Sequence, residues 1–225
     1  MADRSRPPFL VLDVTIWSEL AAADAKLLAE YETSWRDGIS RTGRRLNCRQ
    51  GCIPCCMGPF EVTPLDAVRL AVGLLEMGST HPDRAALLGR RAMRLACEMA
   101  AAMEHRLPTG TLPSDQGERE GLLGEFSSTP CPAVSRRSGR CLLYAFRPLS
   151  CRSYGLPVMC GGETLPPCSL NLEGVPAAAW PHYAIEPDPA DREGELLALI
   201  QILAPGSPDT TVAGALAAAR KLLSA

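Results

Sequence analysis

Nine of the ten cysteines in this chain fall into two compact blocks. The first block reads Cys48-Arg-Gln-Gly-Cys52-Ile-Pro-Cys55-Cys56. Thiolates gathered at such spacing are the ligands that soft metals prefer, so the pattern predicts a site for an iron–sulfur cluster or for zinc. The second block spreads its five thiols at nearly even intervals, at Cys131, Cys141, Cys151, Cys160 and Cys168.

The spacing inside the first block allows its sulfurs to converge. Cysteines three or four positions apart share one face of a helical turn, and Gly51 and Pro54 could instead form a tight turn with the same result. The adjacent Cys55 and Cys56 point in different directions, so we do not expect both to bind one ion in the same way. One of them would face a second metal, bridge two ions or remain unliganded.

The second block is poor in helix signal and rich in turn signal. Ser138 and Gly139 favour a tight turn that would place Cys131 and Cys141 on the two arms of a hairpin-like loop. Four prolines between residues 148 and 167 exclude long helices. A bound metal would supply the cohesion that so little regular structure lacks.

The number of thiols leaves the type of site open. Nine exceed the four that one tetrahedral ion takes, so they suit one cluster with spare thiols, two separate sites or a polynuclear site. Arg147 and Arg152 flank Cys151 and are candidate cofactor-binding residues, because a guanidinium can offset the negative charge of a cluster or donate to sulfur. The alternative for both arginines is pairing with acidic side chains at the surface.

The remaining cysteine and the histidines are not expected to be ligands. Cys97 lies among apolar residues of an expected helix and is interpreted as a small buried residue. The three histidines all lie outside the first block. Of His81, His105 and His182, only His182 is near the second block in sequence.

Composition limits the classes of partner. The formal net charge of −2 argues against a broad nucleic-acid-binding face. No segment approaches the roughly 18 apolar residues that span a bilayer, and no secretory signal is visible, so we expect a cytoplasmic protein without a membrane partner. In a reducing compartment, cysteines bind metal more often than they form disulfides. A disulfide framework stays open because ten is an even number.

Apolar periodicity predicts a mainly α fold: a helical hairpin and flanking helices around an irregular, cysteine-rich, metal-binding knot. Residues 1–16 are expected to be disordered or extended, and 17–225 to form one domain with its metal-binding region at 45–170. Helices are expected at 17–36 with Ser18 as cap, at 64–78 ended by Gly78, at 82–105, and in the C-terminal region 189–224. The last region would hold helices at 189–204, capped by Asp188 or Asp191, and at 209–223, and residues 108–129 are expected to be a surface loop.

The chain resembles a known family over about residues 45–170. The resemblance rests on four motifs. They are the CxxxCxxCC block, the Thr63-Pro64-Leu65-Asp66 helix start, Gly-Arg-Cys-Leu-Leu-Tyr around Cys141 and Arg-Pro-Leu-Ser-Cys-Arg-Ser-Tyr around Cys151. They are similar to the cysteine-cluster proteins described as a zinc- or iron-chelating domain. The resemblance implies metal binding, in the form of an iron–sulfur cluster, by all nine cysteines of the two blocks, as in bacterial-type proteins. Flagellin lysine N-methylases carry a similar cysteine domain, so the resemblance also implies protein methylation as one activity.

Three functions therefore remain as hypotheses. The first is an iron–sulfur protein, with a 4Fe–4S cluster, in a redox or accessory role with an electron or protein partner. The second is a structural zinc module that presents helices to a partner. The third is a modifying enzyme of the protein lysine N-methylase type. Whether the chain is an enzyme is left open by the sequence.

Overall fold

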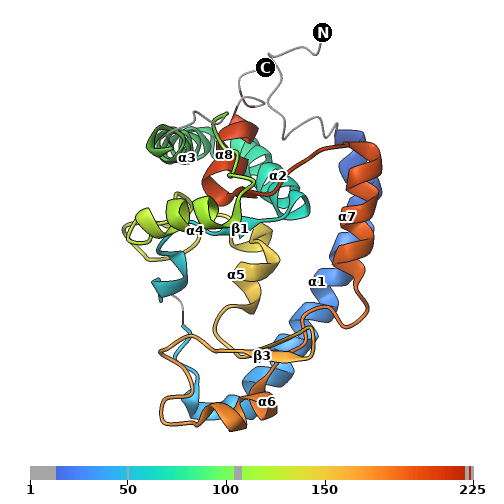
Figure 1. The fold of residues 1–225 in the computed structure, drawn as a ribbon. Coiled ribbons are helices and arrows are strands. Elements are labelled where there is room, and N and C mark those ends of the chain that lie inside the picture. Colours follow the sequence, from blue (N-terminus) through green and yellow to red (C-terminus); the bar gives the residue numbers. More distant parts are fainter. Residues whose placement is uncertain (1–13, 50, 104–107, 221–222, 224–225) are drawn as a thin grey trace.

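The computed structural model describes residues 14–49, 51–103, 108–220 and 223. In this part of the chain, eight α-helices stand against two sheets of two short strands each (Figure 1). The expectation of a mainly α fold is therefore confirmed. Residues 1–13 lie outside the described part, as does His105, while residues 14–16 of the segment expected to be disordered or extended are helical.

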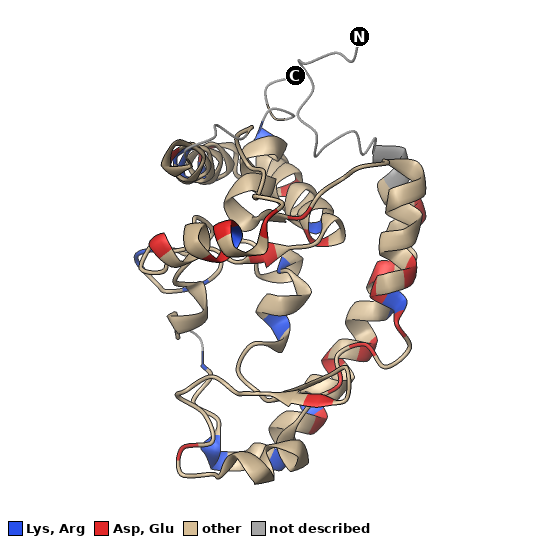
Figure 2. Ribbon diagram, viewed as in Figure 1, with Lys and Arg blue, Asp and Glu red and all other residues tan. Residues whose placement is uncertain are grey.

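A long N-terminal helix and a later helix lie side by side along one edge of the molecule (Figure 1). They are α1 (Val14–Thr42) and α7 (Arg192–Leu203). Leu20 and Leu27 of α1 are fully buried and belong to one apolar cluster with Ile200 of α7. This burial of an apolar stripe on each helix stabilises the pair. Acidic and basic residues are spread along α1 and, on α7, lie in its first turn (Figure 2).

Helix α1 is longer at both ends than the predicted 17–36. It begins four residues before Ser18, so Ser18 is not its N-cap. It also continues through Gly38, although glycine disfavours helix interiors. A Cβ built on Gly38 would lie 2.4 Å from a methyl carbon of Ile185, so the close packing at this point requires a residue without a side chain.

The predicted helical hairpin packs with the last helix of the chain. The hairpin consists of α2 (Pro64–Thr80) and α3 (Pro82–Ala102), and both contact α8 (Val212–Arg220). Helix α2 begins as predicted, because the Thr63 hydroxyl accepts a hydrogen bond from the Asp66 amide at 3.3 Å. It does not end at Gly78, however, but runs two residues further. Residues 104 and 105 of the predicted 82–105 helix lie outside the described part.

Both C-terminal helices were predicted, but each begins three residues later than expected, and the first runs from Arg192 to Leu203 instead of 189–204. Helix α7 is capped by Asp188, whose carboxylate accepts from the amides of Arg192 at 2.9 Å and Glu193 at 2.7 Å. Asp191, the alternative cap, makes no such bond. The last helix starts at Val212 instead of 209, because β4 (Thr210–Thr211) first pairs antiparallel with β1 (Glu61–Val62).

The expected surface loop at 108–129 contains a helix, so that prediction was wrong. This helix is α4 (Gln116–Glu125). The Asp115 carboxylate caps it by accepting from the Glu118 amide at 2.9 Å. Leu122 anchors it in an apolar cluster that includes Leu95 of α3. A cap and one buried leucine are enough to stabilise this helix, because its packing against α3 takes the place of a longer apolar stripe.

A buried charge cluster joins α1, α2 and the second cysteine block. The Arg69 guanidinium is 1% exposed and forms ion pairs with Asp24 of α1 and Asp66 of α2. Asp66 also accepts a hydrogen bond from the Leu149 amide at 2.9 Å. Leu149 begins α5 (Leu149–Ser153), so a carboxylate lies at the N-terminus of the short helix that carries Cys151.

The rest of the cysteine-rich region is made of short elements and turns. It lies between the α2–α3–α8 group and the lower end of α1 (Figure 1). The hairpin of β2 (Val158–Cys160) and β3 (Glu163–Leu165) is antiparallel and packs beside the α1 end. The other short elements are the 3₁₀ turns η1 (Gly43–Arg45), η2 (Pro54–Cys56), η3 (Tyr144–Phe146) and η4 (Ala177–Ala179), and the one-turn helix α6 (Trp180–Tyr183).

Candidate metal centre

The first cysteine block forms turns, not an α-helix. The Cys52 amide donates to the Arg49 carbonyl at 3.0 Å, and Gly51 takes a φ of +88°, which favours glycine. Cys55 and Cys56 then follow Pro54 in the single turn η2. Of the two geometries that the spacing allowed, the structure has the turn built by Gly51 and Pro54.

The two-armed loop predicted around Ser138 and Gly139 is present. Val134 and Cys141 pair antiparallel, and the Ser135 amide donates to the Arg140 carbonyl at 2.8 Å. Gly139 closes the loop with a φ of +66°. Cys131 and Cys141 therefore lie on neighbouring arms, as the turn signal indicated.

Backbone contacts hold the two cysteine blocks against each other, although about 75 residues separate them in sequence. The Cys131 amide donates to the Cys56 carbonyl at 2.7 Å. At the other end of the loop, Gly139 approaches Gly51 so closely that a Cβ on Gly139 would lie 2.8 Å from the Gly51 carbonyl oxygen. The fold thus brings thiols from both blocks to one region.

Four thiols form an inner set between η2, the 131–141 loop and α5. The pKa of Cys56 is raised by the charges of three other thiols, Cys131, Cys141 and Cys151. The hydrogen bond with Cys55 lowers it more, so the net shift is downward. Burial is the largest cause that raises the pKa of Cys131, to about 12, and that of Cys141 and Cys151. The inner set is therefore Cys56, Cys131, Cys141 and Cys151, with one thiol from the first block and three from the second.

Backbone amides point at two sulfurs of the inner set. Hydrogen bonds from the amides of Ala133 and Val134 lower the pKa of Cys131, against the effect of burial. The Leu143 amide does the same for Cys141. Amide donors two or three residues after a cysteine stabilise its thiolate, which is the form that binds metal.

A second, outer set gathers where the chain before η2 meets the turn after β3. Burial is the largest cause that raises the pKa of Cys48, and the charges of Cys52, Cys168 and Cys55 raise it further. Tyr154 lies beside this set, because Cys168, Cys55 and Cys48 all raise the pKa of its phenol after burial does. Cys48, Cys52 and Cys168 thus form the outer set, and Cys55 borders on both sets.

Asn171 organises the outer set and was missed by the sequence reasoning. Its side chain is 3% exposed and donates to the Cys48 sulfur at 3.2 Å and to the Gly155 carbonyl at 2.7 Å. Its oxygen accepts from the Asn47 amide at 2.7 Å. Its position three residues after Cys168 was the only signal in the sequence, and a lone asparagine in a turn-rich segment does not indicate such a role.

Cys55 and Cys56 are distinguished by a hydrogen bond between their thiols. This bond is the largest cause that raises the pKa of Cys55 and lowers that of Cys56. Whether the two neighbours serve differently as ligands stays a prediction. Cys56 is influenced by the inner set, whereas Cys55 influences both Cys48 and Cys131.

The two candidate arginines have different roles. Arg152 is 7% exposed and its guanidinium is used structurally, since Nε donates to the Arg147 carbonyl at 3.1 Å and Nη2 to the Ala145 carbonyl at 2.5 Å. It also pairs with Glu32 of α1 at 3.2 Å. Its described hydrogen bonds go to carbonyl and carboxylate oxygens, while its charge also lowers the pKa of Cys141, so its role as a cofactor-binding residue stays a prediction.

Arg147 keeps a donor available. Its Nε is buried and has no hydrogen-bond partner among the described residues, while the guanidinium stacks 3.8 Å above the centre of the Tyr144 ring. Its charge lowers the pKa of Cys55, Cys141 and Cys151, although burial or the neighbouring thiol outweighs it. Arg147 therefore acts on three of the thiols, whereas Arg152 is among the causes that lower the pKa of Cys141.

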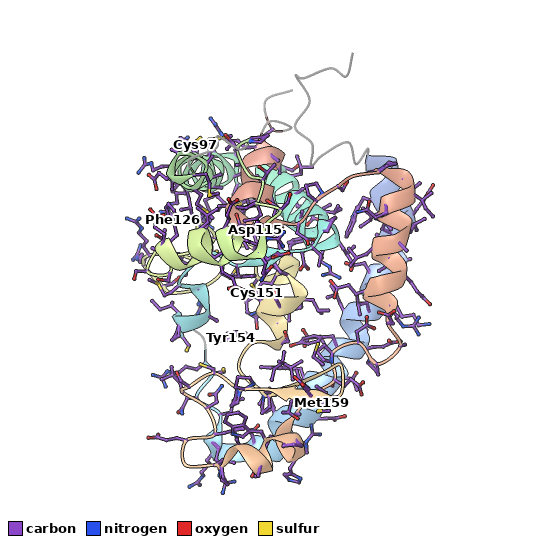
Figure 3. All side chains as sticks on the ribbon, viewed as in Figure 1. Cys97, Asp115, Phe126, Cys151, Tyr154 and Met159 are labelled. Atoms are coloured by element: carbon purple, nitrogen blue, oxygen red, sulfur yellow. The ribbon has the colours of Figure 1, made fainter. Side chains whose placement is uncertain are left out.

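Two cysteines lie apart from both sets. Cys160, at the end of β2, is exposed and is not among the main influences on the pKa of any thiol described above, so its role as a ligand stays a prediction. Cys97 is exposed on α3, which corrects its interpretation as a buried residue. Figure 3 shows Cys97 on α3, well away from Cys151 and Tyr154. His182 packs edge-on against the Tyr183 ring.

In the conformation described, the thiols of each set are neighbours but not yet ligands of one ion. Within residues 14–49, 51–103 and 108–220, no three His, Cys, Asp or Glu side chains are grouped closely enough to hold a metal ion. Comparisons with protein-family models, with curated proteins and with solved structures found no match. No helix in the described part is both long and apolar enough to cross a membrane.

Proposed function

We propose that this protein binds iron–sulfur clusters through two sets of four thiols and serves in electron transfer or as a redox accessory of an enzyme. The inner cluster would be held by Cys56, Cys131, Cys141 and Cys151. We assign Cys55, which borders on both sets, to the outer set as its fourth thiol, so the outer cluster would be held by Cys48, Cys52, Cys55 and Cys168. The observation that carries the proposal is the gathering of thiols from both cysteine blocks into two neighbouring sets.

The composition of the outer set supports this assignment. Three of its cysteines follow one another at short spacing and the fourth comes from a distant part of the chain. The same arrangement, with three local ligands and one remote, is common among proteins that hold iron–sulfur clusters. The inner set mirrors it, with one thiol from the first block and three from the second.

The residues around the inner set fit an anionic cluster. A four-iron cluster with four thiolates carries net negative charge, and Arg147 offers a guanidinium with a buried, unpartnered Nε next to these thiols. The amides of Ala133, Val134 and Leu143 already stabilise thiolate at Cys131 and Cys141. When bound, the cluster would supply reversible one-electron chemistry.

The chain's own part is to hold the thiols in place. The Arg69 cluster fixes the start of α5, and hence Cys151, through the Leu149 amide. Asn171 fixes Cys48 relative to Gly155. Metal binding to these thiols would add its own free energy to that of the fold.

The first test is the iron and acid-labile sulfide content of protein purified without oxygen, together with its visible spectrum. Two four-iron clusters predict about eight iron and eight sulfide ions per chain and a brown colour that bleaches on reduction. Bound zinc without sulfide would instead make the chain a structural zinc module, since four thiols also suit one zinc ion. Zinc found only after aerobic purification is not decisive, so the anaerobic preparation is the one that counts.

Variants test the division into two sets. Cys151→Ser and Cys48→Ser should each remove about half of the iron, and the double variant nearly all of it. Cys97→Ser is the matched control, because this exposed cysteine on α3 belongs to neither set, and its iron content should stay at the wild-type level. If Cys151→Ser alone abolished all iron while Cys48→Ser removed none, one cluster with spare thiols would replace the two-cluster assignment.

A further inference from the structure

A cavity of about 110 Å³ lies between α3 and the chain segment 129–136. Its apolar wall includes Leu95 and Pro132, both buried. Three arginines complete the lining: Arg91 and Arg94 from α3, and Arg136 from the loop that follows Cys131. None of the cysteine chemistry described above makes use of these three side chains.

The charge of this cavity is not balanced by its surroundings. Among the described residues, none forms an ion pair or a hydrogen bond with Arg91, Arg94 or Arg136, whereas five other arginine–carboxylate pairs are formed elsewhere in that part of the chain. Glu98 also lines the cavity, but it pairs with none of the three. The lining therefore carries three cations and one anion.

The position of the arginines follows from the sequence of α3. Arg91 and Arg94 are three residues apart, so they lie on one face of the helix. Arg136 reaches the same space from the opposite side because the Cys131 amide ties its loop to η2. Arginines from two separate elements thus line one hollow, with Arg91 half-buried and Arg94 and Arg136 exposed.

We propose that this cavity binds a small oxyanion, either a carboxylate or a phosphate group. Arginine presents paired N–H donors that match both groups, and such charge-assisted hydrogen bonds are among the strongest in proteins. A space of this volume accepts several water-sized groups and is well below the roughly 300 Å³ at which pockets for larger ligands begin. The group bound inside the cavity is therefore a single phosphate or carboxylate.

The site does not rest on the identity of the metal, because no thiol is needed to bind the anion. It nevertheless adjoins the thiols, since Cys131 contributes to the cavity wall and belongs to the inner set. A bound anion would contact the segment that carries this cysteine.

The test is isothermal titration of the anaerobically purified chain, with inorganic phosphate and with succinate as separate probes in a low-salt buffer. The comparison uses two matched pairs of variants with equal net charge. Arg91→Gln is paired with Arg90→Gln, and Arg136→Gln with Arg137→Gln, because Arg90 and Arg137 are exposed neighbours that do not line the cavity. Circular dichroism confirms that each variant is folded, and the exposed Arg136 gives a variant that does not disturb the helix packing.

We expect at least one of the two probes to bind with a stoichiometry of one anion per chain. Its affinity should fall about ten-fold or more in Arg91→Gln and Arg136→Gln and change little in the control variants Arg90→Gln and Arg137→Gln. The preferred probe tells whether the natural ligand carries phosphate or carboxylate. Equal weakening in all four variants would point to diffuse attraction and overturn the site. Absence of saturable binding by both probes would overturn it as well, whatever the metal content.

Discussion

Replacement of Arg69 by methionine should be among the most damaging single changes in the chain. Arg69 is 1% exposed and lies between the carboxylates of Asp24 and Asp66, which are 3% and 2% exposed. Methionine keeps much of the volume but removes the only positive charge that pairs with either carboxylate among the described residues. Removing one partner of a buried ion pair costs about 3–5 kcal/mol. That is a large share of the roughly 5–15 kcal/mol by which domains are stable.

The cost of Arg69→Met should depend on pH. Burial already raises the pKa of Asp66, and Asp24 raises it further, while Arg69 and the Leu149 amide lower it. Without Arg69, the folded-state pKa of Asp66 rises further. A carboxyl whose folded pKa lies above its unfolded value binds more protons in the folded state, so it destabilises the fold at high pH. This destabilisation is relieved as the pH falls through the folded pKa toward the unfolded value of about 4.

Urea denaturation followed by circular dichroism, at pH 8 and at pH 5, measures both effects in preparations of equal metal content. The control is Arg119→Met, which breaks a partly exposed pair with Glu61 at 2.7 Å. Such pairs contribute about 0.2–1 kcal/mol. The reasoning is refuted if both variants lose the same free energy of unfolding, or if the loss for Arg69→Met does not shrink between pH 8 and pH 5.

Two further predictions concern glycines and are read from thermal unfolding and iron content. Gly73→Ala should lower the free energy of unfolding by about 1–3 kcal/mol, because the new Cβ would lie 2.5 Å from the Phe146 ring. Its control, Gly121→Ala, has open space around the new Cβ and should stabilise α4 by about 0.5–1 kcal/mol. A loss of stability in both variants would contradict this. Gly155→Ala should lower the iron content, because its Cβ would lie 2.8 Å from the Cys48 sulfur and the φ of +128° disfavours alanine. Unchanged iron content would show that the close contact between Gly155 and the Cys48 sulfur is not needed for metal binding.

Local signals in the sequence predicted the helices well where a cap and an apolar stripe occur together. Thr63 and Asp188 were identified as caps and do cap their helices. Helix α4 was missed because, beyond the cap at Asp115, only two adjacent leucines break a polar segment, and the burial of Leu122 depends on α3. Cys97 was misplaced for a related reason, since the buried face of α3 runs through Ala96 and Met99 and leaves Cys97 outside it.

The candidate site shows the same division between local and distant contacts. Short-range turn chemistry predicted the loop closed by Gly139, and it offered the turn in the first block as one of two alternatives. The partition of the thiols does not, because it depends on residues far apart in the chain. Asn171 contacts Cys48 across 123 positions, and Asp66 contacts the Leu149 amide across 83. Neither contact leaves a periodic pattern in the sequence.

The turn η2 places one thiol beside each set within two consecutive residues. A metal ion bound by Cys56 of the inner set also fixes the peptide unit between Cys55 and Cys56. The outer set then loses less conformational entropy when Cys55 binds its own ion. Filling of the two sets should therefore be positively cooperative. Filling of one set should favour filling of the other by up to about the 1–2 kcal/mol that fixing one residue's backbone costs, while each set can still be filled alone, as in the half-loaded Cys151→Ser and Cys48→Ser variants.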